Sequence, residues 1–548
     1  MKFRLFFGGI VAAGALAVQA GEMRRPKAIM FMLDGLRADA IESAEMPNVA
    51  KLRDGTWQSG YRGLWSLTGR TVPDAMPSSA PNHVTLATGV VAAKHGVVRN
   101  GQTKNGHYDR WPTWLARVVE SRPDTKALYA FSWSENKDLG VHPKVRFLEQ
   151  SDEANATSLP KIMAVPDAPD AVLYFIDLPD HFGHMTGFYP HGNGYLHALH
   201  QADAYVGAVL DAIASRPSFK DEDWLVAVTG DHGGYTYAHG MWGGHASTVP
   251  LVAAGRRLEQ GRIPASPHHY DLTATILAHF GLDVAALELD GQVLGNAAPP
   301  VEERPLKDGL VAFLPFAEGV TNLIAGGPAA KLFGAAKRID RGFIDAALHL
   351  SGGSNVVGGV RLEGSERLTY GPGGSFAVTL WARLPKDQTG DPAIFGNKSW
   401  NLGVNPGLVL TAARTTPTAV FAKSGFPYRG VSFNCGTSGE TKRLDLGTFH
   451  FTPNAWTFYA VTRSAEGVVT FYHGDADGRF NWIADDGSRM TLESGLPFCL
   501  GQDGTGCYRF GLEGDIDDFA LWTRSLEPED VRRIFEAGRK GLGLADLL

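Results

Sequence analysis

Four continuous apolar runs constrain the fold of this chain more than any other feature of its sequence. They cover residues 28–33, 171–176, 224–229 and 249–255. Unbroken hydrophobicity is typical of strands in a parallel sheet that is covered on both faces. Helical apolar spacing appears between and after these runs, for example over 197–215 and 269–280. The first half of the chain is therefore predicted to be an α/β doubly wound sheet with helices on both faces.

The character of the sequence changes near residue 295. Residues 295–308 contain Ala-Ala-Pro-Pro-Val-Glu-Glu-Arg-Pro, a composition typical of a linker. Beyond it, short alternating segments separated by Gly, Asp and Asn predict an all-β sandwich. A chain of 548 residues is too long for one domain. We therefore predict an α/β domain over 21–294, a linker over 295–308 and a β-sandwich domain over 309–548.

The N-terminus has the pattern of an export signal. Lys2 and Arg4 precede an apolar run over 5–18 that ends in Ala-Val-Gln-Ala. This pattern predicts a signal peptide over 1–20, cleaved after Ala20. An uncleaved membrane anchor is the alternative, but the run is short for a membrane span. We expect a protein that is secreted, periplasmic or at the cell surface, with no membrane span after cleavage.

Charge and cysteine content exclude several classes of site. The net charge of −7 is mild and Lys and Arg form no stripe, so duplex nucleic acid is not an expected partner. The three cysteines are Cys435, Cys499 and Cys507, all in the second half. Cys499 and Cys507 could close a small disulfide loop in an oxidising compartment. Any metal in the first half must be held by His and carboxylate side chains.

Polar residues follow or precede the apolar runs at their ends. In chain order they are Asp34, Asp180, His184, Asp231, His232 and His245. Each alone has an ordinary structural explanation, such as an acid–histidine hydrogen bond or a helix-starting aspartate. Together they lie where open α/β sheets place their ligands. Three carboxylates and three imidazoles without sulfur suit zinc. Six ligands exceed the need of one ion, so we predict two Zn²⁺, a pair suited to displacement at phosphorus.

A hydroxyl precedes a proline in the segment Ser79-Ala-Pro-Asn-His83. Proline belongs in the first turn of a helix, so Ser79 is predicted at a helix N-terminus, where free N–H groups favour an anion. The plain alternative is that Ser79 is only the helix N-cap. Because a nearby metal would lower the pKa of its hydroxyl, Ser79 is the predicted nucleophile.

These motifs, with Asp34-Gly35, Asp180-x-x-x-His184 and Asp231-His232-Gly233, resemble the alkaline phosphatase superfamily over roughly residues 27–290. The closest branch is the type I phosphodiesterase/nucleotide pyrophosphatase family, which Thr88-Gly89, His95-Gly96 and Asn100 also match. The resemblance implies an alkaline phosphatase-like sheet and two zinc sites. One zinc would be held by Asp180, His184 and His245, and the other by Asp34, Asp231, His232 and the Ser79 oxygen. Asn100 would donate to a phosphoryl oxygen.

Two departures from the family pattern bear on this assignment. The nucleophile is Ser where the eukaryotic diesterases have Thr, and both are hydroxyls. The segment between His232 and His245 is short, which makes His239 the alternative to His245 as a ligand. A histidine shortly before a Val-Pro strand fits the wider superfamily and favours His245.

The second half resembles a concanavalin A-like (laminin G-like) jelly roll. Segments 347–352, 375–381, 456–462 and 514–522 carry this resemblance. It implies glycan binding, in some members with Ca²⁺, although a packing module is equally consistent because fold does not determine function.

The combined expectation is a secreted two-zinc phosphodiesterase or nucleotide pyrophosphatase that hydrolyses a phosphate ester through a covalent phosphoserine at Ser79. A phosphomonoesterase on the same metals is the first alternative. A sulfatase is less expected, because its Ser/Cys-x-Pro-x-Arg motif would need arginine at His83 and no cysteine is present here. A catalytically silent, glycan-binding surface protein is the alternative from another class.

Overall fold

The computed structural model describes residues 24–240, 244–263, 266–295, 297, 304–401, 404–414, 429–436 and 443–548. The predicted signal peptide (1–20) and part of the predicted linker (295–308) lie outside the described residues. The domain boundaries given above stay predictions. Within the described part of the chain, no helix has the length and apolarity needed to span a bilayer.

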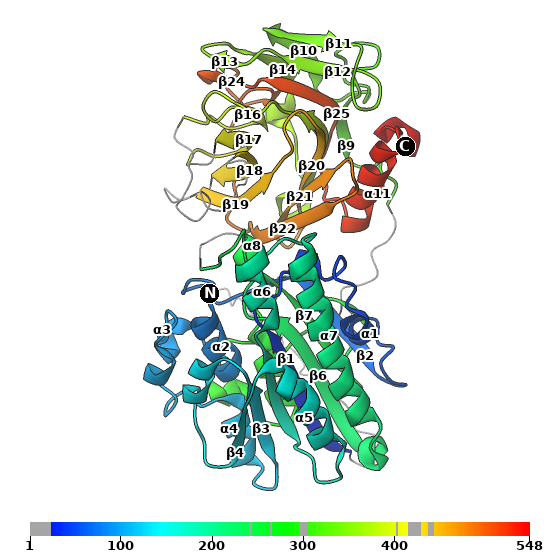
Figure 1. Cartoon of the computed structure of the whole chain (residues 1–548). Helices are drawn as coiled ribbons and strands as arrows, with labels where there is room; N and C mark the ends of the chain where they lie inside the picture. Colours follow the sequence, from blue (N-terminus) through cyan, green and yellow to red (C-terminus); the bar gives the residue numbers. More distant parts are fainter. Residues whose placement is uncertain are drawn as a thin grey trace, which may run out of the picture.

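An eight-stranded sheet forms the N-terminal domain, in the order β4-β3-β5-β1-β6-β7-β2-β8 (Figure 1). The strands are β1 (Arg25–Leu33), β2 (Arg62–Arg70), β3 (Ala127–Phe131), β4 (Val145–Glu149), β5 (Ala171–Ile176), β6 (Glu222–Gly230), β7 (Thr248–Gly255) and β8 (Gly261–Arg262). The five strands from β4 to β6 are parallel, whereas β7 runs antiparallel to β6. All four apolar runs are therefore strands, and the last one is reversed. The predicted doubly wound α/β architecture is confirmed.

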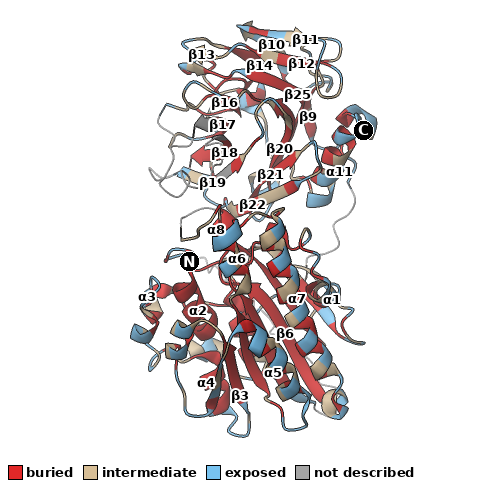
Figure 2. Ribbon diagram, in the orientation of Figure 1, coloured by how far each residue is buried: buried red, intermediate tan, exposed pale blue. Residues whose placement is uncertain are grey.

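Helices cover both faces of this sheet, which explains the unbroken hydrophobicity of its strands. Successive side chains of β1 enter two different cores, with Phe31 on one side and Met30 on the other. In Figure 2 the central strands are buried over nearly all of their length. The first face is covered by α1 (Pro47–Arg53), α5 (Asp152–Ala164) and α7 (Asn193–Ala214). The second is covered by α2 (Ser79–Thr88), α4 (Trp114–Ser121) and α9 (Asp271–His279).

Two packed antiparallel sheets form the C-terminal domain, which confirms the predicted jelly-roll sandwich. Their orders are β10-β14-β23-β16-β17-β18-β19 and β11-β12-β25-β15-β20-β21-β22, with β9 paired to β25. The strands of the first sheet are β10 (Ala329–Gly334), β14 (Gly358–Glu363), β16 (Ala393–Gly396), β17 (Leu408–Arg414), β18 (Arg429–Gly436), β19 (Arg443–His450) and β23 (Phe498–Leu500). Those of the second are β9 (Leu310–Leu314), β11 (Ala336–Ile339), β12 (Ala347–Leu350), β15 (Phe376–Arg383), β20 (Trp456–Arg463), β21 (Val468–Asp475), β22 (Phe480–Asp486) and β25 (Gly514–Trp522). Helix α11 (Pro528–Arg539) packs on the outer face of the second sheet through Phe535, against Trp381 and Phe458.

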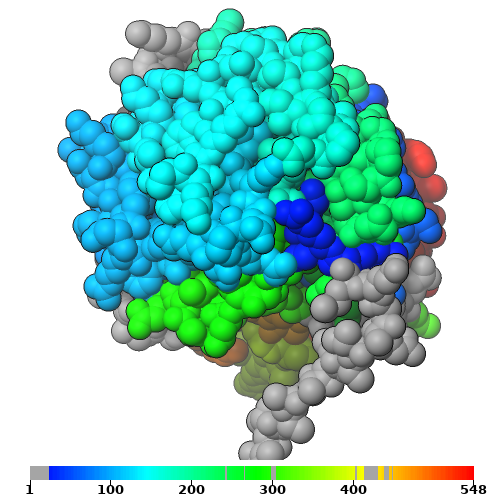
Figure 3. Space-filling view, turned by 90° about the horizontal axis from the view of Figure 1, so that it is seen from below, coloured from blue at the N-terminus to red at the C-terminus, as the bar shows by residue number. Residues whose placement is uncertain are grey.

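The sandwich rests on the edge of the N-terminal sheet at which β6 ends. The short helix α8 (Gly244–Ser247) leads into β7, and because β7 is antiparallel to β6, α8 lies at that same edge. Strands β19 and β22 pack against α8. Figure 3 shows the molecule from below, from the end farthest from the sandwich, so that the N-terminal domain faces the viewer and hides most of the sandwich.

The cysteine pairing considered from the sequence is absent. Cys435 and Cys499 are buried free thiols, and Cys507 is an exposed one. Cys499 lies within β23, while the thiol of Cys507 turns to the Thr505 hydroxyl at 3.3 Å. The two thiols therefore do not close a disulfide loop.

Candidate active site and metal centre

Two aspartates at the ends of neighbouring strands form the base of the site. Asp34 follows β1 and Asp231 follows β6, and the last residues of these parallel strands are in register. Oδ1 of Asp231 accepts hydrogen bonds from the backbone N–H groups of Gly35 (3.1 Å) and His232 (2.8 Å). Adjacent strand ends thus bring together carboxylates that are almost 200 residues apart, as the strand-end rule predicts.

Gly35 lets a third carboxylate approach. Its φ of 71° lies in the left-handed region, and a Cβ there would stand 3.0 Å from the Cα of Asp180. Asp180 belongs to the first turn of α6 (Leu178–Thr186), which follows β5 directly. Glycine is needed at this position because any side chain would push α6 away from the strand ends.

Asp180 and His184 lie one turn apart on α6 and face the same way. His184 Nε2 is 3.4 Å from Asp180 Oδ2, while His184 Nδ1 donates to the carbonyl of Tyr237 at 2.8 Å. That bond leaves Nε2 with its lone pair toward the cluster, the arrangement found in metal-binding histidines. His239 completes this group, with Nε2 3.6 Å from Asp180 Oδ1.

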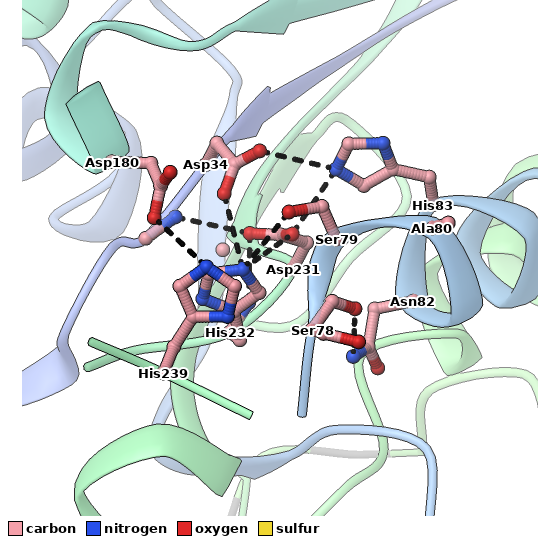
Figure 4. Close-up of polar contacts among 12 residues, drawn as sticks. Asp34, Ser78, Ser79, Ala80, Asn82, His83, Asp180, Asp231, His232 and His239 are labelled. Atoms are coloured by element: carbon pink, nitrogen blue, oxygen red, sulfur yellow. Dashed lines mark hydrogen bonds and ion pairs between the residues drawn. The ribbon is translucent and has the colours of Figure 1, made fainter. Parts of the chain in front are cut away.

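His232 occupies the centre of the cluster (Figure 4). Its Nε2 lies 3.2 Å from Asp34 Oδ1 and 3.3 Å from Asp231 Oδ2. Its Nδ1 donates to the carbonyl of Gly233 at 2.7 Å, so Nε2 is again the atom free to bind a cation. The ring stacks on that of His239 with the centroids 3.9 Å apart. Burial and the neighbouring His232 lower the pKa of His239 to about 3, so its imidazole is neutral, the form that binds metal.

Ser79 is the first residue of the ten-residue helix α2, and its hydroxyl points into the cluster (Figure 4). Its Oγ lies 3.3 Å from Nε2 of His232. The N-cap position belongs to Ser78, whose side chain makes no capping hydrogen bond. The alternative role of Ser79 as the N-cap is therefore wrong, and its hydroxyl is directed at the polar cluster instead.

Asn100 is tied to the same helix end. Its carboxamide oxygen accepts from the backbone N–H of Ala80, the residue after Ser79, at 2.9 Å. This bond uses only the oxygen, so the amide NH₂ group keeps its donors for another partner. The exposed side chain is thus held beside the candidate nucleophile.

His83 is a member of the cluster that the sequence reasoning did not assign. Its Nε2 lies 3.1 Å from Asp231 Oδ2 and 3.4 Å from Asp34 Oδ2, and its Nδ1 bonds with Asn136 at 2.9 Å. His83 follows Ser79 by four residues, so both project from one face of α2. That spacing is the signal from which its place could have been inferred.

The cluster has the charge and ligand chemistry of a cation site. Among the described residues, three groups have candidate ligand atoms within 4.8 Å of one another. They are Asp180-His184-His239, Asp34-His83-Asp231 and Asp34-Asp180-His232. Burial raises the pKa of Asp34 well above its usual range, and the nearby Asp231 and Asp180 raise it further. Oδ1 of Asp34 and Oδ1 of Asp180 are buried without a hydrogen bond. A bound divalent ion would satisfy these oxygens and relieve the repulsion between the carboxylates.

His245 lies apart from these groups, in α8. Its Nδ1 is 3.2 Å from Nη2 of Arg37, and its ring stacks on Tyr235 at 4.6 Å. Phe449 of the sandwich meets the ring edge-on at 5.2 Å. Of the seven sequence-predicted metal-binding residues, the structure thus gathers six and places His245 beside them at the domain interface.

His95, from the matched His95-Gly96 pair, has a structural environment that makes folding pH-dependent. Its Nδ1 accepts from the Val97 N–H at 3.1 Å and its Nε2 bonds with the Thr85 hydroxyl at 2.8 Å, which requires the neutral ring. Burial lowers the pKa of His95 from 6.5 to about 4. Between these values the unfolded chain binds more protons, so stability falls as the pH falls from 6.5 to 4.

Because of His95, the free energy of unfolding is expected to fall by up to about 1.4 kcal/mol per pH unit as the pH falls through this window. It is measured by urea unfolding of chelator-treated protein at several pH values, so that metal release does not contribute. His95→Gln should have a shallower dependence below pH 6.5 than the wild type and the same dependence from pH 7 to 8. An equal slope in both proteins below pH 6.5 would contradict the assignment.

Family comparisons agree with the two-domain organisation. The family model of type I phosphodiesterase/nucleotide pyrophosphatase matches residues 28–142, and the sulfatase model matches residues 90–282. The model of the concanavalin A-like lectin/glucanases superfamily matches residues 356–532. The predicted resemblance is confirmed for both domains. The N-terminal part is of the alkaline phosphatase type, and the C-terminal part is concanavalin A-like.

Individual relatives are distant. Venom phosphodiesterase 2 of Crotalus adamanteus is 26% identical over 230 residues, covering 37% of this chain and 26% of that protein. Ectonucleotide pyrophosphatase/phosphodiesterase family member 3 of Mus musculus is 25% identical over 232 residues, covering 38% and 25%. A solved structure of murine ectonucleotide pyrophosphatase/phosphodiesterase 5 is 14% identical, with a TM-score of 0.38, covering 47% of this chain and 96% of that one. The chain spans about a quarter of the length of the first curated relatives that it matches.

Proposed function

We propose that this protein is a metal-dependent phosphodiesterase in which Ser79 is the nucleophile. The observation that carries the proposal is the hydroxyl of Ser79 at the N-terminus of α2, 3.3 Å from His232 within the Asp/His cluster. The match to the type I phosphodiesterase model supports it, because residues 28–142 include Asp34, Ser79 and Asn100. The match to the sulfatase model begins only at residue 90, after the candidate nucleophile, so a sulfatase is less well supported.

Two zinc ions fit the donor set best, since imidazole-rich sites suit zinc and all-oxygen octahedra suit magnesium. One ion would be held by Asp34, Asp231 and His232, and the other by Asp180, His184 and a second histidine. The arrangement of side chains supports His239 for that position, where the sequence favoured His245. When bound, zinc would supply positive charge beside the phosphoryl oxygens and lower the pKa of the Ser79 hydroxyl.

The reaction would proceed by two displacements at phosphorus. In the first, Oγ of Ser79 bonds to phosphorus while the bond from phosphorus to the leaving oxygen breaks, and the proton lost by Oγ passes through solvent to that oxygen, which leaves as the alcohol. In the second, the oxygen of a water bonds to phosphorus while the bond to Oγ breaks, and one proton of that water returns to Oγ, which regenerates the Ser79 hydroxyl. The positive end of the α2 dipole and the amide NH₂ group of Asn100 would stabilise the phosphoryl oxygens in both steps.

The assignment of the second histidine is tested by paired variants. His239→Ala is expected to bind about one zinc per chain, because it removes one of the three proposed ligands of the second ion, the others being Asp180 and His184. His245→Ala is expected to bind two, because its ring contacts Arg37 and Tyr235. Zinc content after dialysis gives the result. The reverse pattern would return the ligand role to His245.

Diesters are proposed as the substrate because little positive side-chain charge is available at Ser79. A monoester dianion needs concentrated positive charge around three free oxygens, such as an arginine fork. Of the basic residues nearest in sequence, Arg70 pairs with Asp485 and Lys94 with Asp290. Arg99 is exposed. On α2, Ala80 and Val84 are buried and apolar, and no Lys or Arg lies within that helix. A diester carries one negative charge fewer and needs less compensation.

Steady-state comparison of matched aryl diester and monoester substrates tests this preference. The kcat/KM is expected to favour the diester, and Arg99→Ala is expected to keep the same order. A kcat/KM tenfold or more in favour of the monoester, about 1.4 kcal/mol in barrier, would replace the diesterase with a phosphomonoesterase.

Export and glycan binding are further proposals. Export is supported by the N-terminal sequence pattern and by relatives named as venom and ecto-enzymes. Glycan binding by the sandwich, with or without Ca²⁺, is supported by its concanavalin A-like fold alone. Binding without catalysis is the less favoured alternative, because the Ser79 hydroxyl lies beside Asp and His side chains that could hold a metal ion.

A further inference from the structure

The segment that follows β6 contacts the sandwich as well as the candidate metal centre. We call residues 231–240 and 244–247 the ligand loop, because they include the candidate ligands Asp231, His232 and His239, and also His245, the alternative to His239. Its two parts meet strands β19 and β22 of the sandwich. Along the chain, the side chains proposed to bind zinc are therefore only a few residues from residues that contact the other domain.

Tyr235 makes the most direct of these contacts. It lies three residues after His232 and four before His239, and its hydroxyl bonds with Nε2 of His450 on β19 at 2.6 Å. The two rings stack, with centroids 5.6 Å apart and an interplanar angle of 14°. The backbone N–H of Tyr235 donates to the carbonyl of Ala238 at 2.8 Å, and that of Ala238 donates back at 3.2 Å. The position of Tyr235 therefore sets the turn that leads into His239.

The second part of the loop is held from the same side. A Cβ on Gly244 would lie 3.0 Å from the carbonyl oxygen of Leu446 on β19 and 3.1 Å from that of Ala484 on β22. This close backbone contact needs glycine. Thr248, immediately after the loop, donates its hydroxyl to the carbonyl of Ala484 at 2.6 Å. Arg70 donates to the same carbonyl at 3.1 Å and pairs with Asp485.

We infer that the sandwich positions the metal ligands, and that Tyr235 and His450 are the positioning residues. The inference rests on the proposed metal centre. In the first part of the loop, the Tyr235–His450 bond fixes the turn between two candidate ligands. In the second, β19 and β22 hold α8, whose His245 ring stacks on Tyr235. Partners that orient metal ligands typically change metal affinity 10- to 100-fold when they are removed. The C-terminal domain is thus a structural part of the site, in addition to any binding of its own.

Zinc binding to the full-length, metal-free protein tests this inference, by competition with a chromogenic chelator. Tyr235→Phe removes one hydroxyl. It is expected to lower the affinity for one of the two zinc ions about 10- to 100-fold and to leave the affinity for the other unchanged. His450→Ala should do the same, and His450→Gln should partly restore affinity because its amide can bond with the tyrosine hydroxyl. The matched control is Arg532→Ala, which breaks the interdomain ion pair with Glu42 (2.6 Å) and should bind both ions as the wild type does.

The outcomes separate this inference from the proposed function. If Tyr235→Phe and His450→Ala bind both ions with wild-type affinity, the inference alone is overturned. The same holds if Arg532→Ala loses as much zinc affinity as those two variants do. No zinc binding by the wild type would overturn the metal centre and the inference together. Weakened binding in the two loop-contact variants supports the inference even if the wild type proves inactive on phosphodiesters, a result that would overturn only the proposed function.

Discussion

Ser79→Ala is expected to lower kcat on a diester substrate by at least about a thousandfold, because it removes the atom that would bond to phosphorus. The fold should persist. Ser79 is not the helix cap, alanine is the residue best suited to a helix, and Pro81 still occupies the first turn of α2. The bound zinc should also persist, since the Asp and His side chains remain. Steady-state kinetics, thermal unfolding and metal content on one preparation measure all three.

Ser78→Ala is the matched control for this experiment. Ser78 is the neighbouring hydroxyl at the N-cap and makes no capping hydrogen bond, so its loss should change stability and turnover little. Phosphate from a labelled substrate should be trapped on the wild type and on Ser78→Ala, and not on Ser79→Ala. Covalent phosphate on Ser79→Ala would show that another nucleophile acts.

Removal of metal is expected to abolish activity, and zinc is expected to restore it better than magnesium. The proposed ligands of the two ions are divided equally between carboxylates and imidazoles, a set that suits zinc. They are Asp34, Asp180, Asp231, His184, His232 and His239. Dialysis against a chelator, followed by titration with each ion, gives the activity recovered per ion bound. Full recovery with magnesium alone would contradict the proposed ligand set.

The metal-free protein should also be less stable. Without a cation, Asp34 and Asp231 remain buried close together, and the raised pKa of Asp34 reflects that burial and repulsion. Zinc at a hundred times its Kd should add about 2.7 kcal/mol to the free energy of unfolding for each site. Thermal unfolding with and without zinc measures the difference. His349→Ala removes a sandwich histidine that pairs with Asp515, and it serves as a control that should not change the zinc-dependent shift.

Local sequence patterns were sufficient for the framework of the site. Apolar runs covered on both faces must be central strands, since only such strands bury every side chain. Once these strands are parallel, Asp34 and Asp231 must meet at one edge of the sheet. The Pro at the third position of α2 likewise marks where that helix begins, and so where the hydroxyl of Ser79 lies.

The remaining features depended on contacts that no local pattern encodes. The reversal of β7, the cap at Ser78 in place of Ser79 and the entry of His83 between two carboxylates all follow from packing between distant segments. The separation of His239 from His245 is the clearest case. Both lie in a glycine-rich loop with no periodicity of its own, so its conformation is determined by the surfaces that it meets. Those surfaces are α6 on one side and β19 and β22 on the other, and all three belong to other parts of the chain.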